Sequence, residues 1–248
     1  MIDFVGAGPG AIDLITVRGK KLIEEADIII YAGSLINHQL LDYARSNAKL
    51  FDSSKLNLEE IMDIMINNQD KRIVRLHSGD PSIYGAIEEQ MRLLDQLNIE
   101  YAVCPGVSSM SAAAAVLKKE YTPAEVSQTI IISRMSGRTK VPEAESIEKL
   151  ASHNATMILF LSASLLKELE MALIKGGYDP LTKAAIIYKA SWPEEKIYYC
   201  PLNKLAETGR INNITKTALI VVGKFLEESG TKSKLYDKDF STMYRNAK

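Results

Sequence analysis

The chain has 248 residues, of which 46% are hydrophobic and 25% charged, as in an ordinary globular protein. Thirty basic residues stand against 31 acidic ones, which disfavours nucleic-acid binding, since proteins of that class usually carry a basic excess. No apolar stretch approaches the roughly 20 residues that span a membrane. The amino terminus enters a strand pattern at once, without a basic region and an apolar stretch, so we predict no signal peptide and a cytoplasmic protein.

The first half of the chain alternates strand and helix patterns. Short β-rich apolar runs predict strands at 1–7, 28–31, 49–51, 72–76 and 100–104. Helical patterns with Thr16 and Asn57 as amino-terminal caps predict helices near 17–26, 37–45, 58–65, 86–97 and 109–117. Continuous apolar strands that alternate with helices predict a mostly parallel sheet covered on both faces.

The pattern restarts near Glu120–Pro123, so we predict an α/β domain at 1–120, a second at 121–228 and a polar tail at 229–248. The second domain has strand patterns at 128–133, 155–161, 184–189, 196–200 and 217–222. Helical patterns cover 143–152, 164–175 and 202–208. The strands at 184–189 and 196–200 read as a hairpin, which predicts a mixed sheet.

Two glycine-containing segments follow strands and precede helices: Val5–Gly10 and Ser78–Gly85. In an open parallel sheet, ligands bind where the carboxyl ends of strands meet the amino ends of helices. Glycine has no Cβ, so the backbone at these points can approach a small molecule closely. Both segments therefore predict a small-molecule site at the carboxyl end of the first sheet.

Gly6, Gly8 and Ala11 can also be fitted to a dinucleotide-binding fingerprint. Pro9 interrupts the usual turn-to-helix run, and the second strand ends in Tyr31-Ala32-Gly33 without an acid for a ribose hydroxyl. A nicotinamide-dependent oxidoreductase remains an alternative on these residues. A glycine turn required only for strand-to-helix packing is the structural alternative.

Four segments taken together are more specific: Gly6–Gly10, Tyr31–Leu35, Ser78–Gly85 and Pro105–Ser109. Their order and spacing resemble those of the tetrapyrrole methyltransferase family. The resemblance continues through Val126–Thr129, Gly137–Thr139, Ala190–Glu194 and Ala218–Gly223. These later segments are similar to the branch that methylates carbon 11 of precorrin-4 or cobalt-precorrin-4 in cobalamin biosynthesis. A precorrin methyltransferase with different regiochemistry and a tetrapyrrole carrier without catalysis are the remaining alternatives.

The resemblance implies two α/β domains with S-adenosylmethionine bound in a cleft between them, and a homodimer. By similarity, the cofactor contacts are Pro9, Ser78, Gly79, Asp80, Ile83, Ser108, Ser109, Leu161, Ala190, Thr217 and Ala218. Capping of the following turn is the structural alternative for Asp80. Small residues at several of these positions leave room for the ligand.

The acceptor implied by the resemblance is a macrocycle that bears several carboxylates. Arg134, Arg138 and Lys140 supply three cations on one loop, and arginine binds carboxylates in a bidentate manner. We therefore predict these three as substrate-binding residues, with a solvated loop as the alternative. Arg75 stands within an apolar strand, where it predicts a buried pairing or a role in the cleft.

We assign no catalytic base. Some relatives that methylate uroporphyrinogen place an acid after the tyrosine of the second strand, and here that position is Ala32. The three histidines, His38, His77 and His153, are scattered and predict no protein-bound metal; cobalt, where present, belongs to the substrate. Cys104 and Cys200 are far apart and predict ordinary thiols.

Overall fold

The structure, a computed structural model, describes residues 1–227 and 237–247. It divides into two compact units, Met1–Ala113 with Lys189–Glu195, and Ala114–Tyr188 with Lys196–Lys248. The first division falls inside a helix, and the boundary at residue 120 stays a prediction. Much of the polar tail predicted at 229–248 lies outside the described residues.

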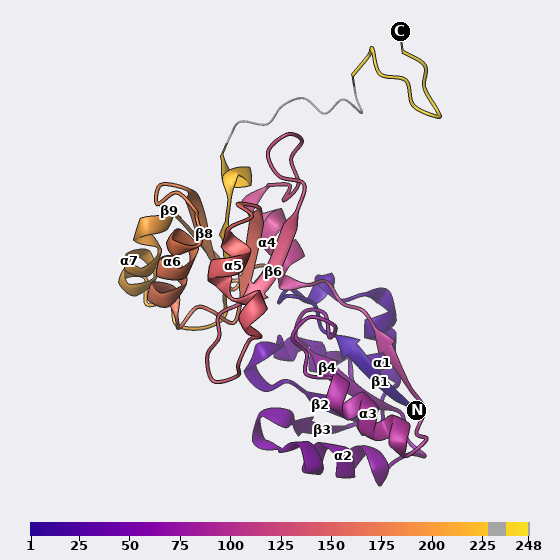
Figure 1. Ribbon diagram of the computed structural model, residues 1–248. Helices are drawn as coiled ribbons and strands as arrows, with labels where there is room; N and C mark the ends of the chain where they lie inside the picture. The colour runs from indigo at the N-terminus through magenta and orange to yellow at the C-terminus, as the bar shows by residue number, and fades with distance from the viewer. Residues whose placement is uncertain (228–236, 248) are drawn as a thin grey trace. The chain divides into compact units, whose positions relative to one another are not determined.

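The first unit is built on a parallel sheet of five strands in the order β3-β2-β4-β1-β5 (Figure 1). The strands are β1 (Ile2–Gly6), β2 (Ile28–Tyr31), β3 (Lys49–Asp52), β4 (Ile73–His77) and β5 (Tyr101–Cys104). The helices that follow them in the chain are α1 (Val17–Glu25), α2 (Leu58–Ile66), α3 (Glu88–Gln96) and α4 (Ser109–Leu117). The predicted parallel sheet is confirmed.

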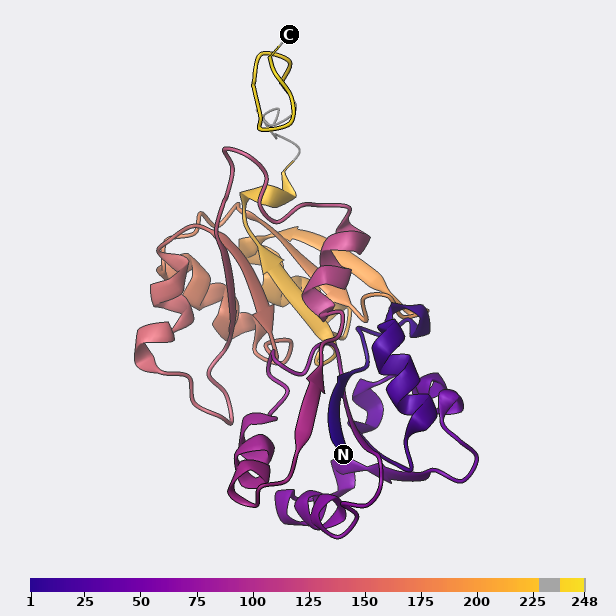
Figure 2. The ribbon, with the colours of Figure 1, turned by 90° about the vertical axis from the view of Figure 1, so that its right-hand side faces the viewer.

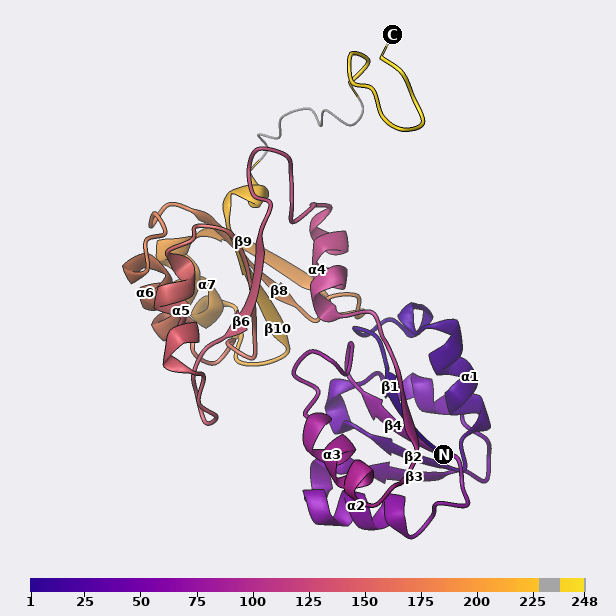
Figure 3. The same cartoon turned by 45° about the vertical axis from the view of Figure 1, so that its right-hand side comes forward.

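Both faces of this sheet are covered by helices, because alternate side chains of each strand point to opposite faces. Phe4 and Ile30 pack in a core with α2 and α3, whereas Val5 and Ile29 pack in a second core with Ile23 of α1. Figure 3 shows α1 on one side of the strands and α2 and α3 on the other. The uninterrupted apolar strands thus fill two cores at once.

The predicted helix caps form as the sequence indicates. The Thr16 hydroxyl accepts a hydrogen bond from the Gly19 N–H at 3.0 Å. Asn57 and Glu60 form a reciprocal capping box, with bonds of 2.9 and 2.8 Å. The segment expected to be helical at 37–45 is a 3₁₀ helix, His38–Tyr43.

The second unit has a mixed sheet of five strands in the order β6-β7-β10-β8-β9. The strands are β6 (Ile130–Arg134), β7 (Thr156–Phe160), β8 (Lys183–Tyr188), β9 (Lys196–Pro201) and β10 (Ala218–Val222). β6 and β7 are parallel, while β8 and β9 form the predicted antiparallel hairpin. β10, the yellow strand in Figure 2, lies between β7 and β8. The predicted mixed sheet is confirmed.

One face of this sheet is covered by α5 (Ile147–Ala151), α6 (Leu166–Lys175) and α7 (Leu205–Ile211). Met157, Ile186 and Ile220, from three adjacent strands, are fully buried against Leu169 and Leu205 of these helices. Figure 3 shows the three helices grouped on one side of the strands. None of the described helices is both long and apolar enough to cross a lipid bilayer.

Candidate active site

Three glycine loops leave the carboxyl ends of neighbouring strands in the first unit. The first glycine loop (Gly6–Ala11) follows β1, the second (Ser78–Gly85) follows β4, and the third (Pro105–Ser109) follows β5. Because β1 lies between β4 and β5 and all three strands are parallel, the loops meet at the carboxyl end of the sheet. The predicted cofactor residues from Pro9 to Ser109 all belong to these loops.

The loops are joined backbone to backbone. Gly8 and Gly79 exchange two hydrogen bonds, of 3.2 and 2.8 Å, and the Ala7 N–H donates to the His77 carbonyl at 2.7 Å. A Cβ on Gly6 would lie 2.5 Å from the Gly106 Cα, and a Cβ on Gly106 would lie 2.1 Å from the Gly79 carbonyl oxygen. These approaches are possible only for glycine, so Gly6 and Gly106 fulfil the packing role.

Gly79 differs from these glycines. Its φ is +64°, and the nearest atoms to a Cβ placed there are the Ser109 nitrogen at 3.6 Å and the Ser108 Cα at 3.8 Å. A Cβ at Gly79 would therefore lie at ordinary contact distance from the third glycine loop. We name this position beside Ser108 and Ser109 the cradle, because the absence of a side chain lets a ligand approach the backbone there.

Asp80 joins the second glycine loop to the third. Its Oδ1 accepts from the N–H of Ser82 at 2.9 Å and from the Ser82 hydroxyl, and its Oδ2 accepts from the Gly106 N–H at 2.8 Å. Burial by itself raises the pKa of Asp80, but the hydrogen bonds from Ser82 and Gly106 outweigh it and hold that pKa below its usual value. The carboxylate is ionised at neutral pH and fixes both loops; its contact with a cofactor stays a prediction.

Two buried polar residues, Arg75 and His77, lie on β4, the strand that precedes the second glycine loop. The Arg75 guanidinium donates to the Gln90 Oε1 at 3.3 Å and to the Ile30 carbonyl at 3.2 Å, so the buried pairing predicted for Arg75 is confirmed. Burial lowers the pKa of Arg75 to about 10. Burial and the charge of Arg75 lower the pKa of His77 to about 3. His77 is 4% exposed, and its Nε2 bonds to none of the described residues.

The predicted cofactor residues of the second unit lie at one end of its sheet. Leu161 follows β7, and Thr217 immediately precedes β10, which begins at Ala218. β7 and β10 are antiparallel with Leu159 opposite Ile220, so the end of one meets the start of the other. Leu161 and Thr217 have φ angles of +50° and +56°, and Leu161 is 68% exposed. Left-handed non-glycine residues store strain that is typical of functional sites.

The basic loop after β6 lies at the same end of this sheet, since β6 is parallel to β7. The Arg134 guanidinium donates to the Thr139 and Lys140 carbonyls, both at 3.1 Å, and so organises the loop. Arg138 and Lys140 are exposed and form no ion pair with the part of the chain that the structure describes. These two side chains are the ones available to a carboxylate ligand.

The turn Lys189–Glu195, here named the tryptophan turn, belongs to the first unit and contains Ala190, whose contact with a cofactor stays a prediction; the sequence analysis missed the contacts that this turn makes with the first glycine loop. The Trp192 Nε1 donates to the Pro9 carbonyl at 2.8 Å, and the Ser191 Oγ accepts from the Ala11 N–H at 3.1 Å. A Cβ on Gly10 would lie 2.1 Å from the Trp192 ring. A single sequence holds no signal for a contact between residues 183 positions apart.

These contacts contradict the dinucleotide alternative. A pyrophosphate requires free N–H groups where a glycine loop opens directly into an α-helix. Here the Ala11 N–H is occupied by Ser191, and the loop continues into a 3₁₀ turn, Ile12–Leu14, before α1 begins at Val17.

The remaining candidate groups are metal ligands and thiols. Among residues 1–227 and 237–247, no cluster of three or more His, Cys, Asp and Glu side chains is placed to hold a metal ion. His38 bonds the Gly33 carbonyl through Nε2 at 3.1 Å. Cys104 and Cys200 are free, as predicted.

A parallel sheet with three glycine loops, followed in the same chain by a mixed sheet, defines a two-sheet α/β protein with a candidate small-molecule site at the carboxyl end of its first sheet. A solved structure of a cobalamin biosynthetic enzyme, cobalt precorrin-4 methyltransferase, superposes with a TM-score of 0.88 at 40% identity, covering 91% of this chain and 95% of that one. The cobalt-precorrin-4 C(11)-methyltransferase of Methanocaldococcus jannaschii is 52% identical over 99% of this chain and 96% of its own. The precorrin-4 C(11)-methyltransferase of Pseudomonas aeruginosa is 41% identical over 98% of each chain.

The family model described as Tetrapyrrole (Corrin/Porphyrin) Methylases matches residues 1–206, and the chain belongs to this family. The family resemblance and the two-sheet α/β fold predicted from the motifs are thereby confirmed. So is the enzyme class, a methyltransferase whose methyl donor is S-adenosylmethionine.

Proposed function

We propose that this chain transfers a methyl group from S-adenosylmethionine to carbon 11 of precorrin-4 or its cobalt form during corrin-ring synthesis. The observation that carries the proposal is the 52% identity, over 99% of the chain, to a relative named for methylation at that carbon. The basic loop with Gly137–Thr139 and the turn with Ala190–Glu194 lie within this shared length.

Bound S-adenosylmethionine supplies an activated methyl group for in-line displacement at its sulfonium, so the protein has to orient two ligands and exclude water. In the first unit, Pro9, Gly79, Ser109 and Ala190 would hold the donor beside the cradle at Gly79. Leu161, Thr217 and Ala218 are the contacts we propose from the second unit. Asp80 would act indirectly, because its carboxylate holds two of the loops together.

The decisive experiment measures regiochemistry. The protein is incubated with S-adenosylmethionine and either cobalt-bearing or metal-free precorrin-4, and the position of the added methyl group is determined by NMR. Methylation at carbon 11 supports the proposal, and the faster substrate identifies the metal state. Methylation at another carbon favours a neighbouring precorrin methyltransferase. Tetrapyrrole binding without methyl transfer would favour a carrier.

The placement of the donor is tested at Gly79. A Cβ there would lie 3.6 Å from the Ser109 nitrogen, an ordinary contact distance, although the left-handed φ costs a non-glycine residue about 1–2 kcal/mol. We expect Gly79→Leu to fold and to lose S-adenosylhomocysteine binding in calorimetry, since the side chain would fill the cradle. Normal affinity in a folded variant would contradict this placement.

The placement of the acceptor is tested at Arg138. If its guanidinium binds a substrate carboxylate, Arg138→Ala should weaken acceptor binding by about 1.5–3 kcal/mol. Steady-state kinetics should then show a higher KM for the acceptor and little change in that for S-adenosylmethionine. Arg134→Ala is the matched comparison, because it also removes the bonds that organise the loop. Unchanged acceptor kinetics for Arg138→Ala would indicate a solvated loop.

We also propose a cytoplasmic homodimer that binds no nucleic acid, on family resemblance and on the balanced charge of the chain. Light scattering across a dilution series measures the assembly. A constant mass near 27.5 kDa, the mass of one chain, would contradict the dimer.

A further inference from the structure

The tryptophan turn holds its own shape through internal bonds. The Ser191 N–H donates to the Glu195 Oε2 at 2.6 Å, and the Trp192 N–H donates to the Lys189 carbonyl at 3.0 Å. Lys189 and Ser191 have φ angles of +47° and +68°. Left-handed residues persist only where their surroundings over-determine them. The turn is therefore a rigid support that presents the Ser191 hydroxyl and the Trp192 indole.

In the first glycine loop, three consecutive residues, Pro9, Gly10 and Ala11, each form a hydrogen bond between a backbone group and a side chain from elsewhere in the chain. The Pro9 carbonyl is taken by the Trp192 indole, and the Ala11 N–H by the Ser191 hydroxyl. The Asn37 amide donates to the carbonyl between them, that of Gly10, at 2.9 Å. The loop is thus fixed by the protein's own groups, without a ligand.

The indole also occupies a position that only glycine allows. The Gly10 Cα packs so closely on the Trp192 ring that a Cβ would lie 2.1 Å from the ring atoms. The ring closes one side of the loop, and its N–H anchors the carbonyl of the residue before. A loop fixed in this way loses little conformational entropy when a ligand binds, and such preorganisation increases affinity.

We infer that Trp192 and Ser191 are positioning residues for the methyl donor: they hold Pro9–Ala11 in the conformation that contacts it. The inference rests on the proposed placement of S-adenosylmethionine against this loop. Without the turn's two bonds, the loop would visit other conformations, and the donor affinity would fall in proportion to the competent fraction. By linkage, donor binding in turn stabilises the contact between Trp192 and Pro9.

Trp192 is the only tryptophan of the chain, so the intrinsic tryptophan fluorescence comes from this side chain alone. Titration of the wild-type protein with S-adenosylhomocysteine should change the emission and reduce quenching by acrylamide. Trp192→Phe keeps an aromatic ring against Gly10 but lacks the N–H donor, and Ser191→Ala lacks the acceptor. Loss of one such hydrogen bond should weaken S-adenosylhomocysteine binding roughly three- to tenfold in calorimetry.

The kinetic readout separates positioning from general destabilisation. Both variants should raise the KM for S-adenosylmethionine by a similar factor, with the acceptor KM changed by less than about twofold. Glu194→Gln is the matched control in the same turn: it removes the ion pair with Lys189, whose Nζ lies 5.2 Å from the centroid of the Trp192 ring, but keeps both bonds from the turn to the first glycine loop, so its donor affinity should match that of the wild type.

Two results would overturn the inference. One is an unchanged affinity for S-adenosylhomocysteine in folded Ser191→Ala and Trp192→Phe; if Trp192→Phe does not fold, Ser191→Ala decides alone. The other is an equal loss of donor and acceptor affinity, which a purely structural role would produce. A wild-type protein that does not bind S-adenosylhomocysteine would refute the proposed function and this inference with it.

Discussion

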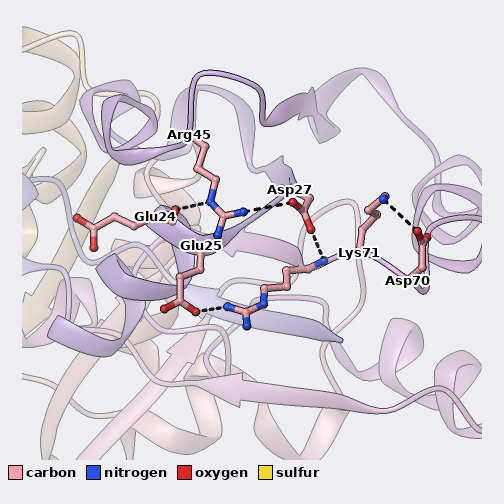
Figure 4. Close-up of polar contacts among 7 residues, drawn as sticks. Glu24, Glu25, Asp27, Arg45, Asp70 and Lys71 are labelled. Atoms are coloured by element: carbon pink, nitrogen blue, oxygen red, sulfur yellow. Dashed lines mark hydrogen bonds and ion pairs between the residues drawn. The ribbon is translucent and has the colours of Figure 1, made fainter.

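The two ends of the first sheet are held together by different kinds of contact. At the carboxyl end, the loops after β1, β4 and β5 meet backbone to backbone, through glycines that leave no space for a Cβ. At the amino end, the segments before β2 and β4 share backbone bonds to the Arg72 carbonyl, from the N–H groups of Asp27 at 2.9 Å and Ile28 at 3.2 Å, and are flanked by long charged side chains (Figure 4). Close backbone packing leaves little freedom to adjust, whereas solvated charges can rearrange.

The amino-end network centres on Asp27, which precedes β2. Its carboxylate pairs with Arg45 at 3.4 Å and accepts from the backbone N–H of Arg72 at 2.9 Å, and Arg72 also pairs with Glu25. The acids of these two pairs are 34% exposed and the arginines more. We therefore expect substitutions in the glycine loops at the carboxyl end to lower the stability of the fold more than substitutions in the charged network at the amino end.

The largest effect is expected at Gly106. Gly106→Ala forces a Cβ to within 2.1 Å of a backbone oxygen that cannot move without breaking the contact between the loops. We expect a loss of about 3 kcal/mol or more in the free energy of unfolding, beyond ordinary overpacking, measured by urea denaturation. The control is Gly137→Ala, where the nearest atom is the end of the Leu165 side chain at 3.4 Å. Equal stability of the two variants would refute the comparison.

Asp80 tests the side-chain bond at the carboxyl end. Asp80→Asn removes the charge and keeps only one acceptor oxygen, so one of the donors, Ser82 or Gly106, faces an amide NH2 and stability at pH 7 should fall by about 1.5–3 kcal/mol. Because the folded pKa of Asp80 is depressed, its contribution is present above the ordinary value near 4. It is lost as pH falls through the depressed folded value. The gap between wild type and variant should therefore narrow in acid; a constant gap would contradict the role of the charge.

The sequence predicted the elements of the fold well because their causes are local. Apolar strand runs, Thr16 and Asn57 as caps, and the hairpin between 184–189 and 196–200 are each decided by residues close in the chain. The glycines were harder to interpret. A Cβ at Gly6 or Gly106 would collide with backbone, whereas one at Gly79 would lie at ordinary contact distance, and only the positions of neighbouring loops distinguish these glycines.

The parts of the site that escaped prediction depend on contacts between distant residues. Asp80 is engaged by Gly106, 26 positions away, and the Pro9 carbonyl by Trp192, 183 positions away. The predicted substrate binding by Arg134 stays a prediction; its guanidinium also bonds two carbonyls of its own loop. Residue type indicated the chemistry available at these positions, and the partners became visible only in three dimensions.

His77 provides a pH test at the carboxyl end of β4. Its folded pKa of about 3 lies below the ordinary value of 6.5, so the unfolded chain binds a proton that the folded chain does not. Above pH 6.5 neither state binds this proton, so His77 has no effect on stability. Below pH 6.5 the protonation of His77 in the unfolded chain lowers the free energy of unfolding by up to about 1.4 kcal/mol per pH unit. His77→Leu should lose less stability than wild type between pH 7 and 5 in urea denaturation. Identical pH profiles for wild type and His77→Leu would refute the buried, neutral histidine.

The smallest effect is expected at the amino end. Arg45→Met keeps most of the apolar stem and removes the ion pair with Asp27, whose partners are 45% and 34% exposed. Exposed pairs contribute about 0.2–1 kcal/mol, so urea denaturation should show a loss within that range. The loss should shrink at about 0.5 M salt, where the Debye length is only a few ångströms. A loss of unfolding free energy above about 2 kcal/mol that persists in salt would mean that Arg45 stabilises the fold about as much as the contacts between the glycine loops do. The contrast between the two ends of the sheet would then be wrong.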